Sequence, residues 1–133
     1  MPLKHLPVLA LASLGLAYAQ DISTEAWYAV PDGRGVQVVN IECGRDYIDP
    51  REIVVEPDTP VEFAVRGENP GEEFQAERIA SLPVEKSARK LGFTPRGRGS
   101  KHGIFCKRQG APDSEVDPRK RGILHIGHPH GRP

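Results

Sequence analysis

Short β-rich runs, each ended by turn residues, limit what this chain can fold into. The run PVEFAV, residues 60–65, places Val61, Phe63 and Val65 at alternate positions, which is the period of a half-buried strand. Proline and glycine recur between such runs, and no segment after residue 30 carries a long helical pattern. Strands are expected at 36–42, 52–56, 60–65, 103–106 and 122–126, with 74–79 a strand or a short helical turn. The pattern predicts an all-β sandwich, with loops over 67–73 and 107–121 and no assignment for 82–101.

The N-terminal residues have the composition of a secretory signal peptide. Lys4 and His5 precede an apolar run from Leu6 to Leu16, and Ala17-Tyr18-Ala19 ends it. The run is shorter than the roughly 20 residues that a membrane-spanning helix needs. Residues 1–19 are therefore expected to be cleaved, and the protein to be exported to the periplasm or outside the cell.

Two cysteines, Cys43 and Cys106, would then lie in an oxidising compartment. These cysteines could form a disulfide or could bind a metal ion as two thiolates. They cannot do both, because a disulfide has no thiolate. Met1 is the only methionine, so the exported chain would have no thioether ligand.

Charge is unevenly distributed along the chain. Residues 20–85 contain 15 acidic and 5 basic residues, whereas residues 86–133 contain 3 acidic and 12 basic ones. Two interpretations remain: a surface for an oppositely charged partner, or halves that neutralise each other within one fold.

The order of the pieces suggests a known architecture. In YIDPREIVVEPDTPVEFAVRGENPGEEF, residues 47–74, an aromatic residue and a proline precede two strands, then a polar loop and Phe74. Near the end, a strand closing in Cys106 is followed by a loop and the strand GILHI. This order resembles the cupredoxin-like Greek-key β-sandwich, over residues 36–126. With the signal peptide at 1–19, the resemblance divides the rest of the chain into an N-terminal extension (20–35), the cupredoxin-like domain (36–126) and a histidine-containing tail (127–133).

A blue-copper site of that fold needs two imidazoles and a thiolate, usually with an axial thioether. Here Glu72 or Glu73 stands where the first histidine falls, and the loop 107–121 has no histidine. Blue-copper electron transfer is therefore not expected. The pattern is most similar to the cupredoxin-like domains of EfeO-type periplasmic iron-uptake proteins. That resemblance implies a metal site of Cys43, Glu72 or Glu73, and Cys106, holding copper or iron, and no metal if the cysteines are bridged.

Glu72 and Glu73 lie in a polar loop just before Phe74, so one of them is expected to project outward, and the resemblance implies that the other points toward Cys106. Replacing the inward one by Gln is expected to weaken metal binding at least about tenfold. Folding is expected to change little, because a loop carboxylate near water contributes little to stability. His125, His128 and His130 are a weak candidate for binding Cu²⁺, Ni²⁺ or Zn²⁺ in a mobile tail.

No catalytic motif is present, so an enzyme is not expected. The basic runs lack interleaved aromatic residues, which argues against nucleic acid and favours solvated loops. The sequence thus leaves two functions: binding or delivery of a transition metal at a Glu/Cys site, or a metal-free, disulfide-stabilised sandwich with a structural role or a periplasmic or extracellular protein partner.

Overall fold

The computed structural model describes residues 25–127. The predicted signal peptide and the tail residues His128 and His130 lie outside this range. Ten strands and two short 3₁₀ helices make up the described part of the chain. In chain order they are Trp27–Tyr28 (β1), Gln37–Cys43 (β2), Ile48–Asp49 (β3), Glu52–Val55 (β4), Val61–Gly67 (β5), Glu72–Ala76 (β6), Ala80–Pro83 (β7), Arg89–Phe93 (β8), Lys101–Arg108 (β9), Asp113–Glu115 (η2), Pro118–Lys120 (η3) and Arg121–Ile126 (β10).

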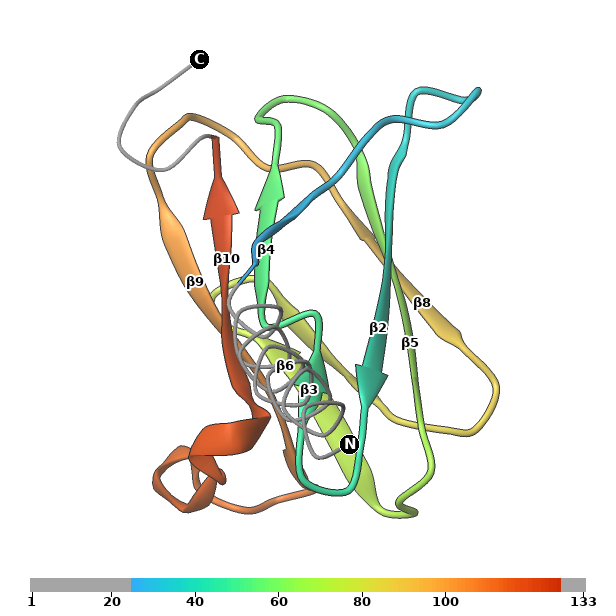
Figure 1. The fold of residues 1–133 in the computed structure, drawn as a ribbon, viewed down its shortest axis with the longest axis vertical. Helices are drawn as coiled ribbons and strands as arrows, with labels where there is room; N and C mark the ends of the chain where they lie inside the picture. Colours follow the sequence, from blue (N-terminus) through green and yellow to red (C-terminus); the bar gives the residue numbers. More distant parts are fainter. Residues whose placement is uncertain (1–24, 128–133) are drawn as a thin grey trace, which may run out of the picture.

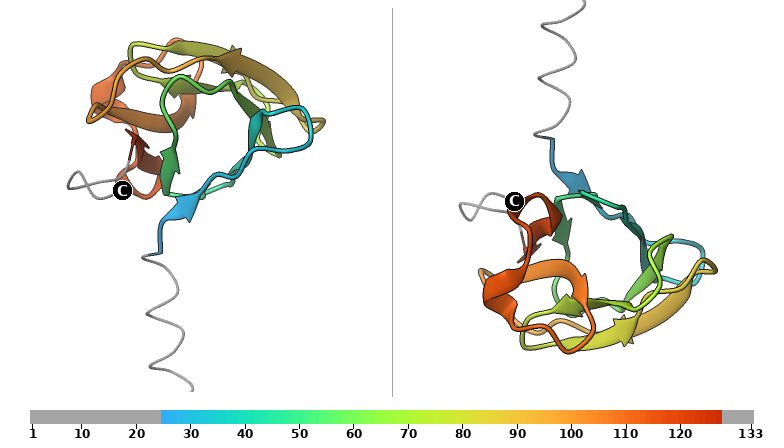
Figure 2. Two further views of the ribbon diagram at one scale, coloured as in Figure 1. Left: turned by 90° about the horizontal axis from the view of Figure 1, so that it is seen from above. Right: turned by 90° about the horizontal axis from the view of Figure 1, so that it is seen from below.

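These strands form two mixed sheets packed face to face (Figure 1). One sheet has the order β1-β4-β10-β9-β6-β7 and the other the order β3-β2-β5-β8. Three pairs are parallel: β1 with β4, β4 with β10, and β2 with β5. Figure 2 shows both sheets curving around a common interior. The predicted all-β sandwich is confirmed. Among the described residues, no helix is long and apolar enough to cross a membrane.

The core follows the alternation seen in the sequence. Val61, Phe63 and Val65 on β5 are at most 1% exposed, while Glu62 and Ala64 between them are half-buried. Phe63 meets Phe74 of the opposite sheet edge to face, with ring centroids 5.8 Å apart. The side chains that alternate inward on β5 therefore join the two sheets.

Gln37 has the one fully buried uncharged polar side chain among the described residues. The hydrogen bonds of this side chain all go to backbone groups of one turn. Its Nε2 donates to the carbonyl oxygens of Glu56 (3.1 Å) and Thr59 (3.2 Å), and its Oε1 accepts from the Glu56 amide (2.7 Å). A buried amide is tolerated when its donors and acceptor are all paired. Gln37 thus holds the turn between β4 and β5.

Several segments differ from the sequence-based expectation, among them β3 and β7, which were not expected as strands. β8 lies in the segment 82–101 that has no assignment, and it pairs with β5 as an edge strand. β6 begins at Glu72, so Glu72 and Glu73 belong to a strand and not to the preceding loop. In the predicted extension, Trp27 and Tyr28 pair with β4.

The charge asymmetry is partly resolved within the fold. Five ion pairs of the described residues join the acidic first half to the basic second half: Glu85–Arg89, Glu56–Arg98, Asp46–Arg119, Glu72–Lys120 and Glu52–His125, the last when the imidazole is protonated. Internal neutralisation therefore accounts for part of the asymmetry.

Candidate functional site at the disulfide pole

Cys43 and Cys106 form a disulfide that ties the two sheets together. Cys43 ends β2 in one sheet and Cys106 lies on β9 in the other, with their Cα atoms 5.9 Å apart. The residues are 0% and 1% exposed and belong to the hydrophobic core. Of the two alternatives left open by the sequence, the structure shows the disulfide. In this state neither sulfur is a thiolate, which is the form that binds metals.

The end of the sandwich around this bond, residues 43–48, 67–72 and 106–120, is called the disulfide pole. Glu72 lies here and faces inward, because it alternates with Phe74 and Ala76, whose side chains are buried in the core. Glu73 has the opposite parity and lies on the outer face. Glu72 also sits on the same face as Cys106, whose register partner is Phe74. Of the two glutamates, Glu72 is therefore the one directed to the interior.

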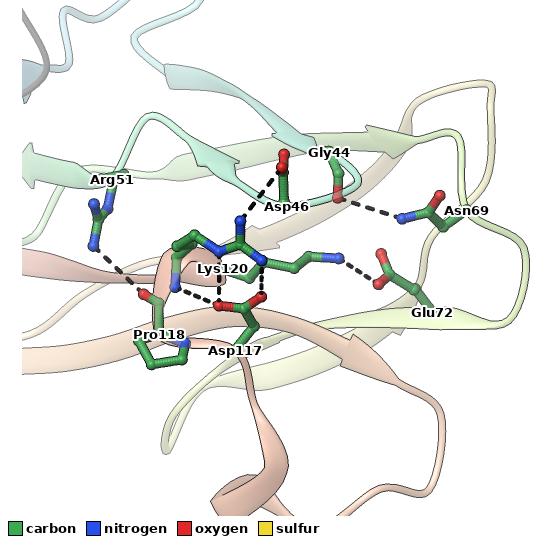
Figure 3. A network of polar contacts seen from close by, with 9 residues as sticks. Gly44, Asp46, Arg51, Asn69, Glu72, Asp117, Pro118 and Lys120 are labelled. Carbon is green, nitrogen blue, oxygen red and sulfur yellow. Dashed lines mark hydrogen bonds and ion pairs between the residues drawn. The ribbon is translucent and has the colours of Figure 1, made fainter.

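The Glu72 carboxylate is already engaged by a cation. The Lys120 ammonium donates to Glu72 Oε2, and the two side chains are only 6% and 14% exposed (Figure 3). The other oxygen, Glu72 Oε1, is buried and has no hydrogen-bond partner. The charge that balances Glu72 is thus a lysine from 48 residues further along the chain.

Lys120 is directed inward by the short helix η3. Asp117 caps this helix by accepting from the Arg119 amide (2.9 Å), and Pro118 occupies its first turn, where proline needs no amide partner. Arg119 reaches back to Asp46 at 3.5 Å, and Arg51 donates to the Pro118 carbonyl at 3.5 Å (Figure 3). The segment that carries Lys120 is therefore fastened to the β2–β3 turn and to the start of β4.

Arg108 and Arg119 of this pole are exposed, as the sequence suggested, whereas Lys107 and Arg121, which follows the pole at the start of β10, are not simply solvated. Lys107 is only 11% exposed along its side chain, and its ammonium binds the Ala111 carbonyl (2.7 Å) and Asp113 Oδ1 (2.9 Å). Arg121 lies over the Phe105 ring at 5.2 Å, a cation–π distance. These cations hold the segment between β9 and β10 in place.

Asp117 offers a direct test of the η3 arrangement. Hydrogen bonds from the Arg119 side chain, and then from its backbone amide, lower the pKa of the Asp117 carboxyl from 3.8 to about 2. Since folding favours the ionised form, this stabilisation is present above pH 3.8 and is lost as the pH falls through about 2.

An NMR titration of the Asp117 carboxyl should give a midpoint near 2, and R119Q should move it toward 3.8. Asp32, whose pKa is lowered mainly by a backbone hydrogen bond from Val36, is the internal control and should not change. Equal midpoints for Asp117 in wild type and R119Q would contradict this geometry.

The residues of the disulfide pole do not fit a transition-metal site. Copper and iron sites need several imidazole, thiolate or carboxylate donors converging on one point. Here both sulfurs are bridged, Glu73 faces outward, and Glu72 has one oxygen on an ammonium group. Among residues 25–127, no three His, Cys, Asp or Glu side chains lie close enough together to hold a metal ion.

His125 belongs to the last strand and not to a mobile tail. It is 8% exposed, and its Nε2 lies 2.8 Å from Glu52 Oε2 on the neighbouring strand β4. His125 is therefore buried and paired with Glu52, and does not belong to a loose tail site as the sequence suggested. The other two histidines of that expected site, His128 and His130, lie outside the described residues.

Lys120 is the residue of this pole that the sequence does not reveal. The Asp117-Pro118 pair is a recognisable helix start, and it places η3. Nothing local to PRKRG, however, distinguishes the inward Lys120 from the exposed Arg119 beside it.

No protein-family model and no curated protein matches this chain in sequence. Solved structures do match it in fold. The metal-binding domain of the Cu(I)-exporting P-type ATPase CopA from Streptococcus pneumoniae D39 has 19% identity and a TM-score of 0.62, covering 79% of this chain and 98% of that one. The blue copper protein auracyanin A from Chloroflexus aurantiacus has 14% identity and a TM-score of 0.51, covering 70% and 100%.

A multi-copper oxidase from Pediococcus acidilactici has 11% identity and a TM-score of 0.56, covering 80% of this chain but 29% of its own. Copper enzymes are thus among the neighbours, and the expectation that this chain is not an enzyme stays a prediction. The likeness to EfeO-type domains also stays a prediction. At these identities the comparisons establish the fold alone: the chain is a cupredoxin-like β-sandwich.

Proposed function

We propose that this protein is an exported, metal-free cupredoxin-like domain with a structural or protein-binding role. The observation that carries the proposal is the disulfide pole: the cysteines are bridged, and Lys120 neutralises the inward glutamate. An ammonium group thus already balances the one carboxylate that is directed into this pole. A buried disulfide also suits an oxidising compartment, which supports the export suggested by residues 1–19.

A second candidate, transition-metal binding or delivery, is favoured by two observations. The neighbour from S. pneumoniae carries Cu(I), and Glu72 Oε1 is a buried acceptor without a partner. For this role the Cys43–Cys106 bond would first take up two electrons and two protons from a thiol reductant, and Lys120 would have to leave Glu72. Copper is the metal favoured by the neighbour, whereas iron rests only on the EfeO-type resemblance.

The unreduced, exported protein distinguishes the two candidates. Because both cysteines are bridged, a thiol titration of denatured protein should find no free thiol, and metal analysis of the same sample should find no stoichiometric copper or iron. Addition of Cu²⁺ should produce no intense absorption near 600 nm (roughly), since no His₂Cys site is available. Two free thiols, or a strong blue colour, would reject the metal-free proposal.

A pair of variants locates any copper binding that is found. H128Q/H130Q serves as the background, so that tail imidazoles do not contribute. In that background E72Q and the matched outward variant E73Q should leave Cu²⁺ affinity unchanged. Weakening by E72Q of about tenfold, or roughly 1.4 kcal/mol, with no effect of E73Q would instead support the metal site.

A further inference from the structure

A cavity of about 420 Å³ lies at the end of the sandwich opposite the disulfide pole. It is bordered by the β6–β7 turn, the segment after β8, the start of β9 and the end of β10. Figure 1 shows the start of β9 beside the end of β10. We call it the basic pocket. Its floor is formed by Ile79, Phe93 and Ile126, and its rim carries Arg78, Arg96 and His102.

Among the described residues, no ion pair joins Arg78 or Arg96 of this rim to a carboxylate. Arg78 donates to the Lys101 carbonyl oxygen at 2.7 Å, a contact that leaves its charge uncompensated. Arg96 is exposed and has no ion pair within the described residues. Three carboxylates lie near the rim: Glu77 accepts from the Gly103 amide at 3.0 Å, Glu56 pairs with Arg98 at 3.9 Å, and Asp58 follows Pro57 where its own amide donates to the Pro95 carbonyl at 2.7 Å. The rim therefore has two guanidinium groups available to an anion.

Ser100 adds a hydroxyl donor to the same rim, beside the ring of His102. His102 Nδ1 lies 2.8 Å from the Glu77 carbonyl oxygen, so this nitrogen carries the proton and donates. The other ring nitrogen, Nε2, lies 3.4 Å from Ser100 Oγ, and both residues line the cavity. The Ser100 hydroxyl can donate its proton either to His102 Nε2 or to an anion bound in the cavity.

The floor is apolar and firmly held. Ile126 is 2% exposed, and Phe93 packs against Phe63 of the core with ring centroids 5.2 Å apart. Pockets that combine an apolar floor with a few convergent polar groups are typical of small-molecule sites. Guanidinium groups are well suited to phosphate because their donors match its oxygens, and a phosphate monoester has three terminal oxygens to receive them.

We propose that the basic pocket binds an organic phosphate monoester, with the phosphate against Arg78, Arg96 and Ser100 and the organic part over Ile79 and Phe93. The inference does not depend on the function proposed for the disulfide pole, which lies at the other end of the molecule. The same chemistry occurs in free organic phosphates and in lipid headgroups that end in a phosphate monoester, and the test separates these sources.

Phenyl phosphate is the probe, followed by amide chemical shifts of the full chain at low ionic strength. A dissociation constant on the order of 1 mM is expected, with shifts confined to residues around the basic pocket. Inorganic phosphate should bind about tenfold more weakly, because it makes no contact with the floor. R96Q should weaken phenyl phosphate binding about tenfold, and R78Q should act similarly.

R45Q is the matched control, since Arg45 is exposed in the β2–β3 turn at the other end of the sandwich. It should leave the affinity unchanged, and the amide spectra report whether each variant is folded. Vesicles that contain phosphatidic acid, whose headgroup is a phosphate monoester, form the second arm: sedimentation of wild type but not R96Q, competed by phenyl phosphate, assigns the site to lipid headgroups. Phenyl phosphate binding without vesicle binding assigns it to free organic phosphates. No binding of phenyl phosphate at about 10 mM, or equal losses in R96Q and R45Q, overturns the proposal.

Discussion

Removing the Cys43–Cys106 disulfide is expected to lower the free energy of unfolding by about 4 kcal/mol. The bond closes a loop with a sequence separation of 63 residues, and on the chain-entropy model most of this stabilisation comes from restricting the unfolded chain. Because the bond is one unit, C43A and C106A should each lose nearly the whole amount, and C43A/C106A should lose little more than either single variant. Denaturant unfolding of the oxidised proteins measures all three.

Reduction supplies the control for this experiment. In dithiothreitol, wild type and C43A/C106A have the same unrestricted unfolded chain, so the remaining difference reports the packing of two buried sulfur atoms. Additive losses from the two single variants in the oxidised state would mean that the cysteines are not bridged in solution.

Removing one member of the Glu72–Lys120 pair should also be strongly destabilising. K120M leaves a buried carboxylate without a cation, and E72L leaves a buried ammonium without an anion, so each is expected to cost about 3–5 kcal/mol. The double variant E72L/K120M replaces both charges by apolar groups and should be more stable than either single variant. A double-mutant cycle by denaturant unfolding gives the coupling between the two side chains.

The exposed pair Glu42–Arg66 is the matched control. Its atoms lie 3.7 Å apart and its side chains are 30% and 50% exposed, so R66M should cost less than about 1 kcal/mol. If K120M costs no more than R66M, the Lys120–Glu72 pair is not formed in the buried geometry described above. A large loss of stability on replacing Glu72 is the opposite of what the sequence suggested. The sequence indicates a loop carboxylate near water, whose replacement would hardly change folding.

The contrast between Glu72 and Glu73 shows how a strand decides the role of neighbouring residues. In the sequence both follow GENPG and read as part of a turn-rich loop. In the structure β6 starts at Glu72 because β9 supplies a partner strand as far as Arg108. Alternation then sends Glu72 inward and Glu73 outward, and this choice depends on a pairing between segments far apart in the chain.

Sequence alone determined the features that arise from local periodicity and turns. The alternation of Val61, Phe63 and Val65 predicted a half-buried strand, and the repeated prolines and glycines predicted short strands and no long helix. Together with the order of Tyr47, Pro50 and Cys106, these features were enough to predict the cupredoxin-like sandwich. Such signals are readable because each involves residues within a few positions of one another.

Tertiary structure decided the chemistry of the disulfide pole. The sequence left Cys43 and Cys106 as ligands or a disulfide, and only the packing of β2 against β9 brings their Cα atoms to 5.9 Å. Likewise, no local pattern marks Lys120 as buried, because its partner Glu72 lies 48 residues away. A charged side chain is buried only where an opposite charge meets it, and that meeting is a property of the folded chain.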